Sequence, residues 1–310
     1  MNQKRNNIII SILSFLLLLT YTLPVSSQTL EIYPDSINRS RLNTVIYTSA
    51  GLYTTTLGVL YFAWYKDNEL TSFHWYNDNK AWLQVDKFGH ATTSYIMSNY
   101  AFWSLRWSGV NNNKSALYAG LMGWSAMTVI EILDGFSNNW GASPGDLVAN
   151  TAGAAFFTGQ QLLWKEQRIR LKFSYHPTEF AQYRPDLLGE NGLQSMLKDY
   201  NGQTYWLSAN ISSFLKNETK FPKWINVSLG YGATGMLGSY SNPIEWDGEV
   251  LPYHNRTRQY YLSFDVDWTR INTNSSFLRF VFKAFSFVKV PFPTLEYNKE
   301  NQFVFHWMFM

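Results

Sequence analysis

The stretch Lys165-Glu-Gln-Arg-Ile-Arg-Leu-Lys-Phe-Ser-Tyr175 divides the chain into two halves with different hydrophobic periods. Before it, apolar residues recur with the period of about 3.6 that is typical of helices. From Ile169 onward, apolar and polar residues alternate, as they do in a half-buried β-strand. The sequence therefore predicts an α+β fold, in which an N-terminal four-helix bundle is followed by a C-terminal antiparallel β region, either a sheet or a small barrel.

Four helices are expected upstream, over residues 42–65, 85–107, 115–133 and 143–165. The last has the clearest start, because Ser143 is a good N-cap, Pro144 suits the first helical position and Asp146 follows in the first turn. Small residues such as Gly153 and Gly159 then allow a neighbouring helix to approach closely. Residues 42–65 carry no charge, so they fit a bilayer span as well as a helix buried in the bundle.

The β half repeats the alternation over residues 169–175, 225–232, 260–269 and 303–309, and more weakly over 205–211, with aromatic residues gathered on one face. A soluble sheet that covers a core fits this pattern. A lipid-facing sheet or barrel, apolar outside and polar inside, fits it as well, and the aromatic-rich last strand favours the outer membrane. Residues 277–290 are expected to form a helix.

The N-terminus is typical of a cleavable export signal. Lys4 and Arg5 precede an apolar run, which Pro24 ends shortly before a small-residue cleavage site at Ser27. We therefore expect a signal peptide over residues 1–27, a helical domain over 28–167 and an aromatic-rich antiparallel β region over 168–310. An exported chain with this organisation belongs to the cell envelope, in the periplasm or at the outer membrane, and membrane association is expected.

Composition narrows the function classes further. Aromatic residues make up 18% of the chain and charged residues only 15%, which suits a protein that meets a membrane. The absence of cysteine excludes disulfides, thiolate catalysis and a lipid-bearing N-terminal cysteine. The formal charge is +3, and two positive charges leave with the signal, so nucleic acid is not an expected partner. Envelope proteins or lipids are the partners that remain.

The helical half carries polar pairs at helical spacing, each embedded among apolar or small residues. A lone carboxylate in such surroundings costs several kcal/mol unless it is paired, protonated or bound to a cation. The pairs are expected to face one another in one pocket between helices. Its members would be Asp86, His90, Glu131, Asp134, Asp146 and Asn150.

Such a pocket suits two kinds of chemistry. Carboxylate oxygens and one imidazole can hold a divalent metal, for which the candidates are Asp86, His90, Glu131, Asp134 and Asp146. Neighbouring carboxylates can also run acid–base catalysis, with all six residues as catalytic candidates. Taken singly, each residue has a plainer explanation. Asp146 complements a helix dipole, Asp134 caps a helix end and His90 is a satisfied core histidine.

Three segments carry a resemblance to a known family. They are Asp86-Lys-Phe-Gly-His90, Glu131-Ile-Leu-Asp-Gly-Phe-Ser137 and Ser143-Pro-Gly-Asp-Leu-Val-Ala-Asn-Thr-Ala-Gly153. In this order they resemble the predicted periplasmic lipoproteins that include YfiM and, more distantly, the VanZ-like membrane proteins. The whole chain resembles a long form, with a C-terminal β half, found in Bacteroidetes-type envelopes. The resemblance implies an envelope location and no particular reaction.

Two functions are therefore compatible with the sequence. The first is a structural or interaction role at the outer membrane, with the buried carboxylate and histidine cluster specifying the helical half. The alternative is a metal-assisted or acid–base enzyme that acts on an envelope lipid or a cell-wall component. The absence of a recognisable nucleophile motif favours the first, and the convergence of carboxylates near one histidine favours the second.

Overall fold

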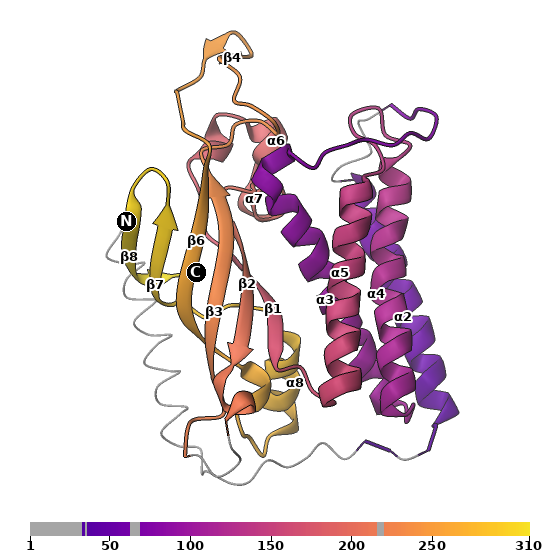
Figure 1. The fold of residues 1–310 in the computed structure, drawn as a ribbon. Coiled ribbons are helices and arrows are strands. Elements are labelled where there is room, and N and C mark those ends of the chain that lie inside the picture. The colour runs from indigo at the N-terminus through magenta and orange to yellow at the C-terminus, as the bar shows by residue number, and fades with distance from the viewer. Residues whose placement is uncertain (1–32, 35, 63–68, 216–219) are drawn as a thin grey trace.

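The computed structural model describes residues 33–34, 36–62, 69–215 and 220–310. The expected signal peptide, residues 1–27, lies outside the described residues, as does the end of the uncharged segment at residues 63–65. A helical half and a β half lie side by side, as Figure 1 shows. The fold is therefore α+β, as predicted, with the change of architecture at the start of β1 (Ile169–Tyr175).

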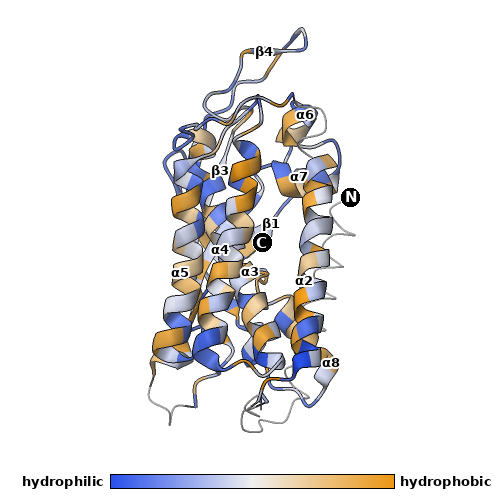
Figure 2. Ribbon diagram, turned by 90° about the vertical axis from the view of Figure 1, so that its right-hand side faces the viewer, coloured by the Kyte–Doolittle hydropathy of each residue, from blue (hydrophilic) through white to orange (hydrophobic). Residues whose placement is uncertain are grey.

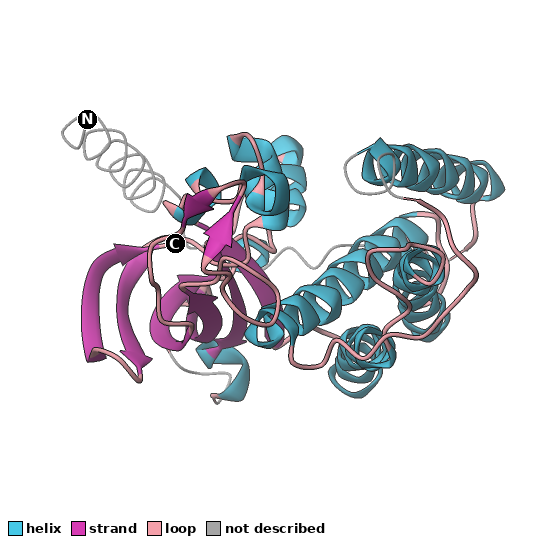
Figure 3. Cartoon of the chain, turned by 90° about the horizontal axis from the view of Figure 1, so that it is seen from above, coloured by secondary structure: helices cyan, strands magenta, loops and turns pink. Residues whose placement is uncertain are grey.

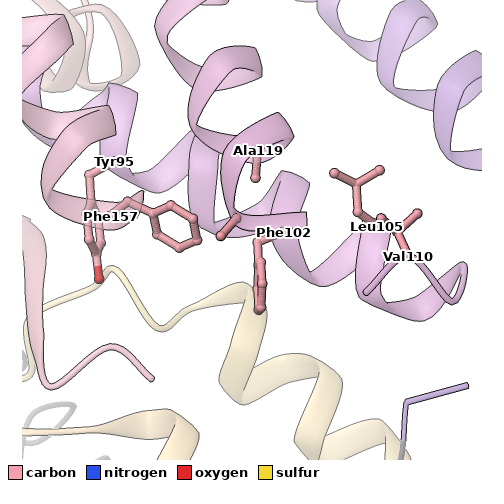
Figure 4. Packing of buried hydrophobic residues seen from close by; sticks show 7 residues of the cluster. Tyr95, Phe102, Leu105, Val110, Ala119 and Phe157 are labelled. Carbon is pink, nitrogen blue, oxygen red and sulfur yellow. The ribbon is translucent and has the colours of Figure 1, made fainter. Parts of the chain in front are cut away.

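Three long helices form the compact part of the helical half: α3 (Val85–Trp107), α4 (Asn112–Asp134) and α5 (Pro144–Trp164). Their core is an apolar cluster in which the rings of Tyr95, Phe102 and Phe157 pack edge to face or tilted (Figure 4). Burial of each such side chain stabilises the fold by roughly 1.5–3 kcal/mol. The same cluster includes Ala116 and Ala119 of α4, so all three helices contribute to the core.

The fourth helix, α2 (Arg39–Leu60), stands apart from the other three, as the view from above shows (Figure 3). Only Val45 is buried along it, and Tyr53 donates a hydrogen bond of 2.7 Å to the Ala126 carbonyl of α4. The helix is therefore not buried within the bundle. Among the described residues, α4 is the one helix long and apolar enough to cross a membrane, and only a third of its most apolar window is buried. Figure 2 shows apolar and polar residues mixed along α4 and α5.

The β half is a six-stranded antiparallel sheet in the order β1-β2-β3-β6-β7-β8. Its further strands are β2 (Gln203–Asn210), β3 (Ile225–Thr234), β6 (Thr257–Val266), β7 (Phe292–Asn298) and β8 (Gln302–Phe309). The short strands β4 (Glu245–Trp246) and β5 (Glu249–Val250) form a separate hairpin, and α6 (Pro185–Leu188) and α7 (Gly192–Lys198) connect β1 to β2. In the described residues the pairing runs from β1 to β8 as an open sheet.

The prediction of a helix over residues 277–290 was wrong for the second half of this range. The helix α8 ends early, at Ser276–Ala284, and the following backbone pairs with the free edge of β1 through a bridge between Phe173 and Val288. Pro291 explains part of the difference, because the residue before a proline avoids the helical region. The segment brings Lys289 into the interior of the sheet, where it is fully buried.

The sheet is polar inside and apolar outside. Lys172 and Asp265 form a fully buried ion pair of 2.7 Å on the inner side. On the outer side, strand register places similar residues in rows. Leucines align across five strands and end on a phenylalanine: Leu171, Leu207, Leu229, Leu262, Leu295 and Phe305. The neighbouring row is aromatic on all six strands: Phe173, Tyr205, Tyr231, Tyr260, Tyr297 and Phe303.

The helix α3 joins the two halves. The Phe88 ring stacks on Tyr231 of the aromatic row at 4.5 Å between centroids, and a side chain at Gly89 would meet the Tyr205 hydroxyl at 2.8 Å. Position 89 therefore lies close to the sheet, and a larger side chain there would have to displace the Tyr205 hydroxyl. These contacts place the first turns of α3 level with the aromatic row.

Candidate functional site

The first turns of α3 supply three ionisable side chains. Asp86, Lys87 and His90 lie on the turns that face α5 and the β half. Tyr200 lies just after α7, and its hydroxyl donates a hydrogen bond of 2.6 Å to Asp86 Oδ1. Both halves of the chain therefore contribute to this group of residues.

The start of α5 supplies Asp146 and Asn150. Ser143 caps the helix as predicted, since its hydroxyl accepts a hydrogen bond of 3.1 Å from the Asp146 amide. Gly153 lets α5 approach α3, because a side chain there would lie 2.0 Å from the Ala91 carbonyl oxygen. This contact confirms the close helix approach predicted from the small residues of α5, and it brings Asp146 and Asn150 next to His90.

The third contribution comes from α4. Glu131 is buried, and its Oε2 accepts a hydrogen bond of 3.0 Å from the Ser143 amide. The same serine donates its hydroxyl hydrogen to Asp78. The N-cap of α5 thus ties Glu131 and Asp78 into one network with Asp146.

Lys87 is the fixed cation of this network. Its Nζ lies 2.6 Å from Asp78 Oδ2, 3.1 Å from Asp86 Oδ2 and 2.8 Å from Asp146 Oδ2. The three carboxylates therefore share one lysine. With Glu131 the network holds four carboxylates against one permanent positive charge, so it carries excess negative charge unless protons or a cation neutralise it.

His90 lies on the other side of the same carboxylates. Its Nε2 is 3.8 Å from Asp86 Oδ1 and 3.7 Å from Asp146 Oδ1. Its Nδ1 is 3.4 Å from Glu131 Oε1 and 3.2 Å from Asn150 Oδ1. Each aspartate thus directs one oxygen to Lys87 and the other toward the imidazole.

Two buried carboxylate oxygens have no hydrogen-bond partner among the described residues. They are Glu131 Oε1 and Asp146 Oδ1. The amide nitrogen of Asn150 is also buried without a hydrogen-bond partner in the described part of the chain. A buried polar atom without a partner costs about 1–3 kcal/mol, and more when it is charged. All three atoms belong to side chains that surround His90. The network is therefore incomplete on the histidine side.

The surroundings push the pKa values of these groups apart. Burial raises the pKa of Glu131 to about 8 and that of Asp146 to about 7, although His90 opposes both shifts. Burial also acts on Asp86, but His90 and Lys87 outweigh it, so the pKa of this aspartate is lowered. Burial disfavours the imidazolium form of His90, yet the nearby carboxylates outweigh it and its pKa is raised. The pKa of Asp86 is therefore shifted in the opposite direction from the pKa values of Glu131 and Asp146.

The structure brings together five of the six residues singled out from the sequence: Asp86, His90, Glu131, Asp146 and Asn150. The sixth, Asp134, lies one turn beyond Glu131, and its Oδ1 accepts a hydrogen bond of 2.6 Å from the Trp140 indole nitrogen. Helical spacing alone does not distinguish Asp134 from Glu131, because both fall on one side of α4.

Sequence reasoning did not assign a site role to Asp78, Ser143 or Tyr200. Asp78 lies in a loop and Tyr200 in the β half, so no helical spacing connects them to the cluster. Lys87 lies between Asp86 and His90 in the first of the three motif segments. Its position directly after Asp86 was the one available signal that the cluster contains a fixed cation.

The part of the chain that contains the cluster matches a known protein family. Residues 74–160 match the model of a family described as predicted periplasmic lipoprotein (DUF2279). No curated protein and no solved structure matches the chain. The match spans α3, α4 and most of α5, and it agrees with an exported protein of the periplasm or outer membrane. It bears on neither the VanZ-like comparison nor the long form with a β half.

Proposed function

We propose that the chain is a membrane-docked protein of the cell envelope, with a structural or interaction role at the outer membrane. The observation that carries this proposal is the polarity of the sheet, which has fully buried charged residues inside and apolar rows outside. A sheet that folds in water on a dry core has the opposite polarity. Acyl chains are the surroundings that this arrangement suits.

The two outer rows match the layers of a membrane. The leucine row presents exposed aliphatic side chains, with Leu229 59% exposed, as a surface inside the hydrocarbon region requires. The adjacent aromatic row contains four tyrosines, and tyrosine is enriched where hydrocarbon meets water. Phe264 and Trp307 lie beyond the leucine row, on the side opposite the tyrosines. Both are exposed, and the exposed fraction of Trp307 is 78%. The rows thus form a band of graded polarity across the sheet.

Only part of this band is covered within the chain. The first turns of α3 lie on Tyr205 and Tyr231, near the β1 end of the aromatic row. The outer side chains of β6 to β8 remain exposed, including Leu262 and Phe305. The uncovered part is therefore the surface proposed to contact lipid.

Vesicle flotation tests the docking. The full-length chain, diluted from detergent into phosphatidylethanolamine and phosphatidylglycerol vesicles, is expected to float with the lipid. Leu262→Asp or Phe305→Asp should reduce the floating fraction strongly, because a charge facing acyl chains costs roughly 2–4 kcal/mol at mid-depth. Val250→Asp, at a residue 77% exposed on the separate hairpin, is the matched control and should float like the wild type. Equal flotation of all four proteins would contradict the proposal.

A second function has its own supporting observation. The cluster around His90 lies at the level of the aromatic row, since Phe88 of the same helix turn stacks on Tyr231. In a docked molecule this is the level of lipid headgroups. Carboxyl groups with pKa values pushed apart are a common basis of acid–base catalysis. An enzyme acting on an envelope lipid or a cell-wall component is therefore the alternative.

Product analysis tests this alternative. The wild type is incubated with a total envelope lipid extract or with cell-wall fragments, and the products are compared by mass spectrometry with those of Asp146→Asn. A new product that the wild type makes and the variant does not would support the enzyme. Identical profiles for the two proteins on both extracts would contradict it.

A further inference from the structure

We propose that Asp86, His90 and Asp146 form a divalent-metal site in which Glu131 positions the imidazole. One carboxylate oxygen of each aspartate and one ring nitrogen of His90 lie within 4.8 Å of one another. The atoms assigned as ligands are His90 Nε2 and the two oxygens nearest to it, Asp86 Oδ1 and Asp146 Oδ1. One imidazole nitrogen with two carboxylate oxygens suits a cation such as Zn²⁺ or Mn²⁺. The site rests on the cluster alone and would supply the metal for the enzymatic alternative.

The separations between the ligand atoms fit a small cation. His90 Nε2 lies 3.8 Å from Asp86 Oδ1 and 3.7 Å from Asp146 Oδ1. Two ligands of a tetrahedral ion with bonds of about 2.0–2.1 Å are about 3.3 Å apart. The atoms therefore need to move by only a few tenths of an ångström. They are also too far apart for hydrogen bonds to one another.

The unpartnered oxygens give the second, independent observation. Asp146 Oδ1 is buried and accepts no hydrogen bond from the described residues, although its neighbour Oδ2 contacts Lys87. A cation between this oxygen and His90 Nε2 would give the atom a partner. It would also offset the excess negative charge that Lys87 leaves uncompensated.

Glu131 has a different place in the site. Its unpartnered Oε1 lies 3.4 Å from His90 Nδ1, the ring nitrogen that faces away from the proposed metal. Histidine ligands usually donate their second ring hydrogen to a carboxylate or carbonyl, which fixes the tautomer and orients the ring. Asn150 Oδ1 is hydrogen-bonded to the same nitrogen at 3.2 Å, and Glu131 Oε1 is the carboxylate oxygen beside it. Glu131 is therefore a positioning residue, and only Asp86, His90 and Asp146 are assigned as ligands.

Metal titration tests the site. The full-length chain in detergent, treated with chelator and then dialysed, is titrated with Zn²⁺ or Mn²⁺ by calorimetry. We expect one ion per chain, and at least a hundredfold weaker binding in His90→Gln and Asp146→Asn. Glu131→Gln should weaken binding by roughly 10–100-fold, as loss of an outer-shell partner does. Asp134→Asn is the matched control and should bind like the wild type.

Two results would overturn the inference. One is the absence of binding of either ion to the wild type, and the other is unchanged affinity in both ligand variants. If the variants do not fold, pulsed paramagnetic resonance of Mn²⁺ on the wild type decides. Coupling to one histidine nitrogen is expected, and its absence contradicts the site. Failure of vesicle flotation leaves these results unaffected, so the two proposals fail separately.

Discussion

His90 Nε2 lies 3.7 Å from Asp146 Oδ1, whereas the second oxygen of the same carboxylate lies 2.8 Å from Lys87 Nζ. Asp146 therefore stands between a fixed cation and a histidine. Asp86 repeats the arrangement from α3, with one oxygen toward each partner. Lysine and histidine thus divide the carboxylate oxygens, and the histidine side is the one left incomplete.

Glu131→Gln is expected to raise the stability of the metal-free protein while it lowers metal affinity. Above the Glu131 pKa of about 8, the substitution removes one negative charge from the cluster of four carboxylates, and glutamine keeps an oxygen for the Ser143 amide. The gain in free energy of unfolding at about pH 9 should be roughly 1–3 kcal/mol. Thermal unfolding with chelator at that pH measures it.

A purely structural cluster predicts the opposite sign for this variant. If Glu131 serves only to hold the helices together, the glutamine variant unfolds at a lower temperature than the wild type, with or without metal. Asp134→Asn controls for the loss of a charge at the same end of α4, and it should leave metal affinity unchanged.

Lys87→Met is expected to destabilise the fold by roughly 3–5 kcal/mol, because it leaves one buried and two half-buried carboxylates without their shared cation. The free energy of unfolding in denaturant measures the loss. Lys80→Met, at an exposed lysine in the loop before α3, is the matched control and should change it by less than about 0.5 kcal/mol. Similar effects of the two variants would show that Lys87 is not central to the cluster.

The buried pair inside the sheet gives a third prediction. Asp265→Leu alone leaves Lys172 buried and unpaired, so it should cost roughly 3–5 kcal/mol. Adding Lys172→Met should recover part of this cost, because both charges are then absent. A double-mutant cycle should give a coupling of at least about 1 kcal/mol. Additive effects would argue that the two side chains do not meet inside the sheet.

Lys289 gives a pH dependence with a defined sign. Burial, together with Lys172, lowers its pKa to about 8, although Asp265 opposes the shift. Between about pH 8 and the ordinary lysine value near 10.4, the unfolded chain holds a proton here that the folded chain lacks. The unfolded state therefore binds more protons, and stability contributed by this group rises with pH across that window.

The matched variant for this effect is Lys289→Met. It should be more stable than the wild type at pH 7, by roughly 1–3 kcal/mol, and the difference should shrink as the pH approaches 10. Unfolding temperatures of the two proteins, compared from pH 7 to pH 10.5, measure it. A difference that stays constant across this range would contradict a lowered pKa at Lys289.

Local signals accounted for most of the fold. Helical periodicity and the Ser143-Pro144 start predicted α3 to α5 within a few residues, because these elements depend on short-range pattern and capping. The strand β7 was not predicted, since Pro293 near its start argues against a strand and leaves only a short alternation before Asn298. The register shift in the β7–β8 pair also turns Phe309 inward, where it stacks on Tyr261 at 4.5 Å. Period counting cannot anticipate a bulge.

The candidate site was predictable as a set of residues but not as an arrangement. The cost of burying carboxylates predicted that Asp86, Glu131 and Asp146 would meet, and they surround His90. The division of oxygens between Lys87 and His90 depends on helix approach and rotation, which follow from Gly153 packing on Ala91. The spacing of residues along the chain does not determine how closely two helices approach or how they are rotated.

The most direct test is a crystal structure of the full chain grown with Mn²⁺, with data collected at the manganese absorption edge. We predict one anomalous peak within about 2.0–2.3 Å of His90 Nε2, Asp86 Oδ1 and Asp146 Oδ1, with Glu131 Oε1 within hydrogen-bond distance of His90 Nδ1. A peak at other residues, or no peak from a crystal grown at saturating Mn²⁺, would contradict the metal site.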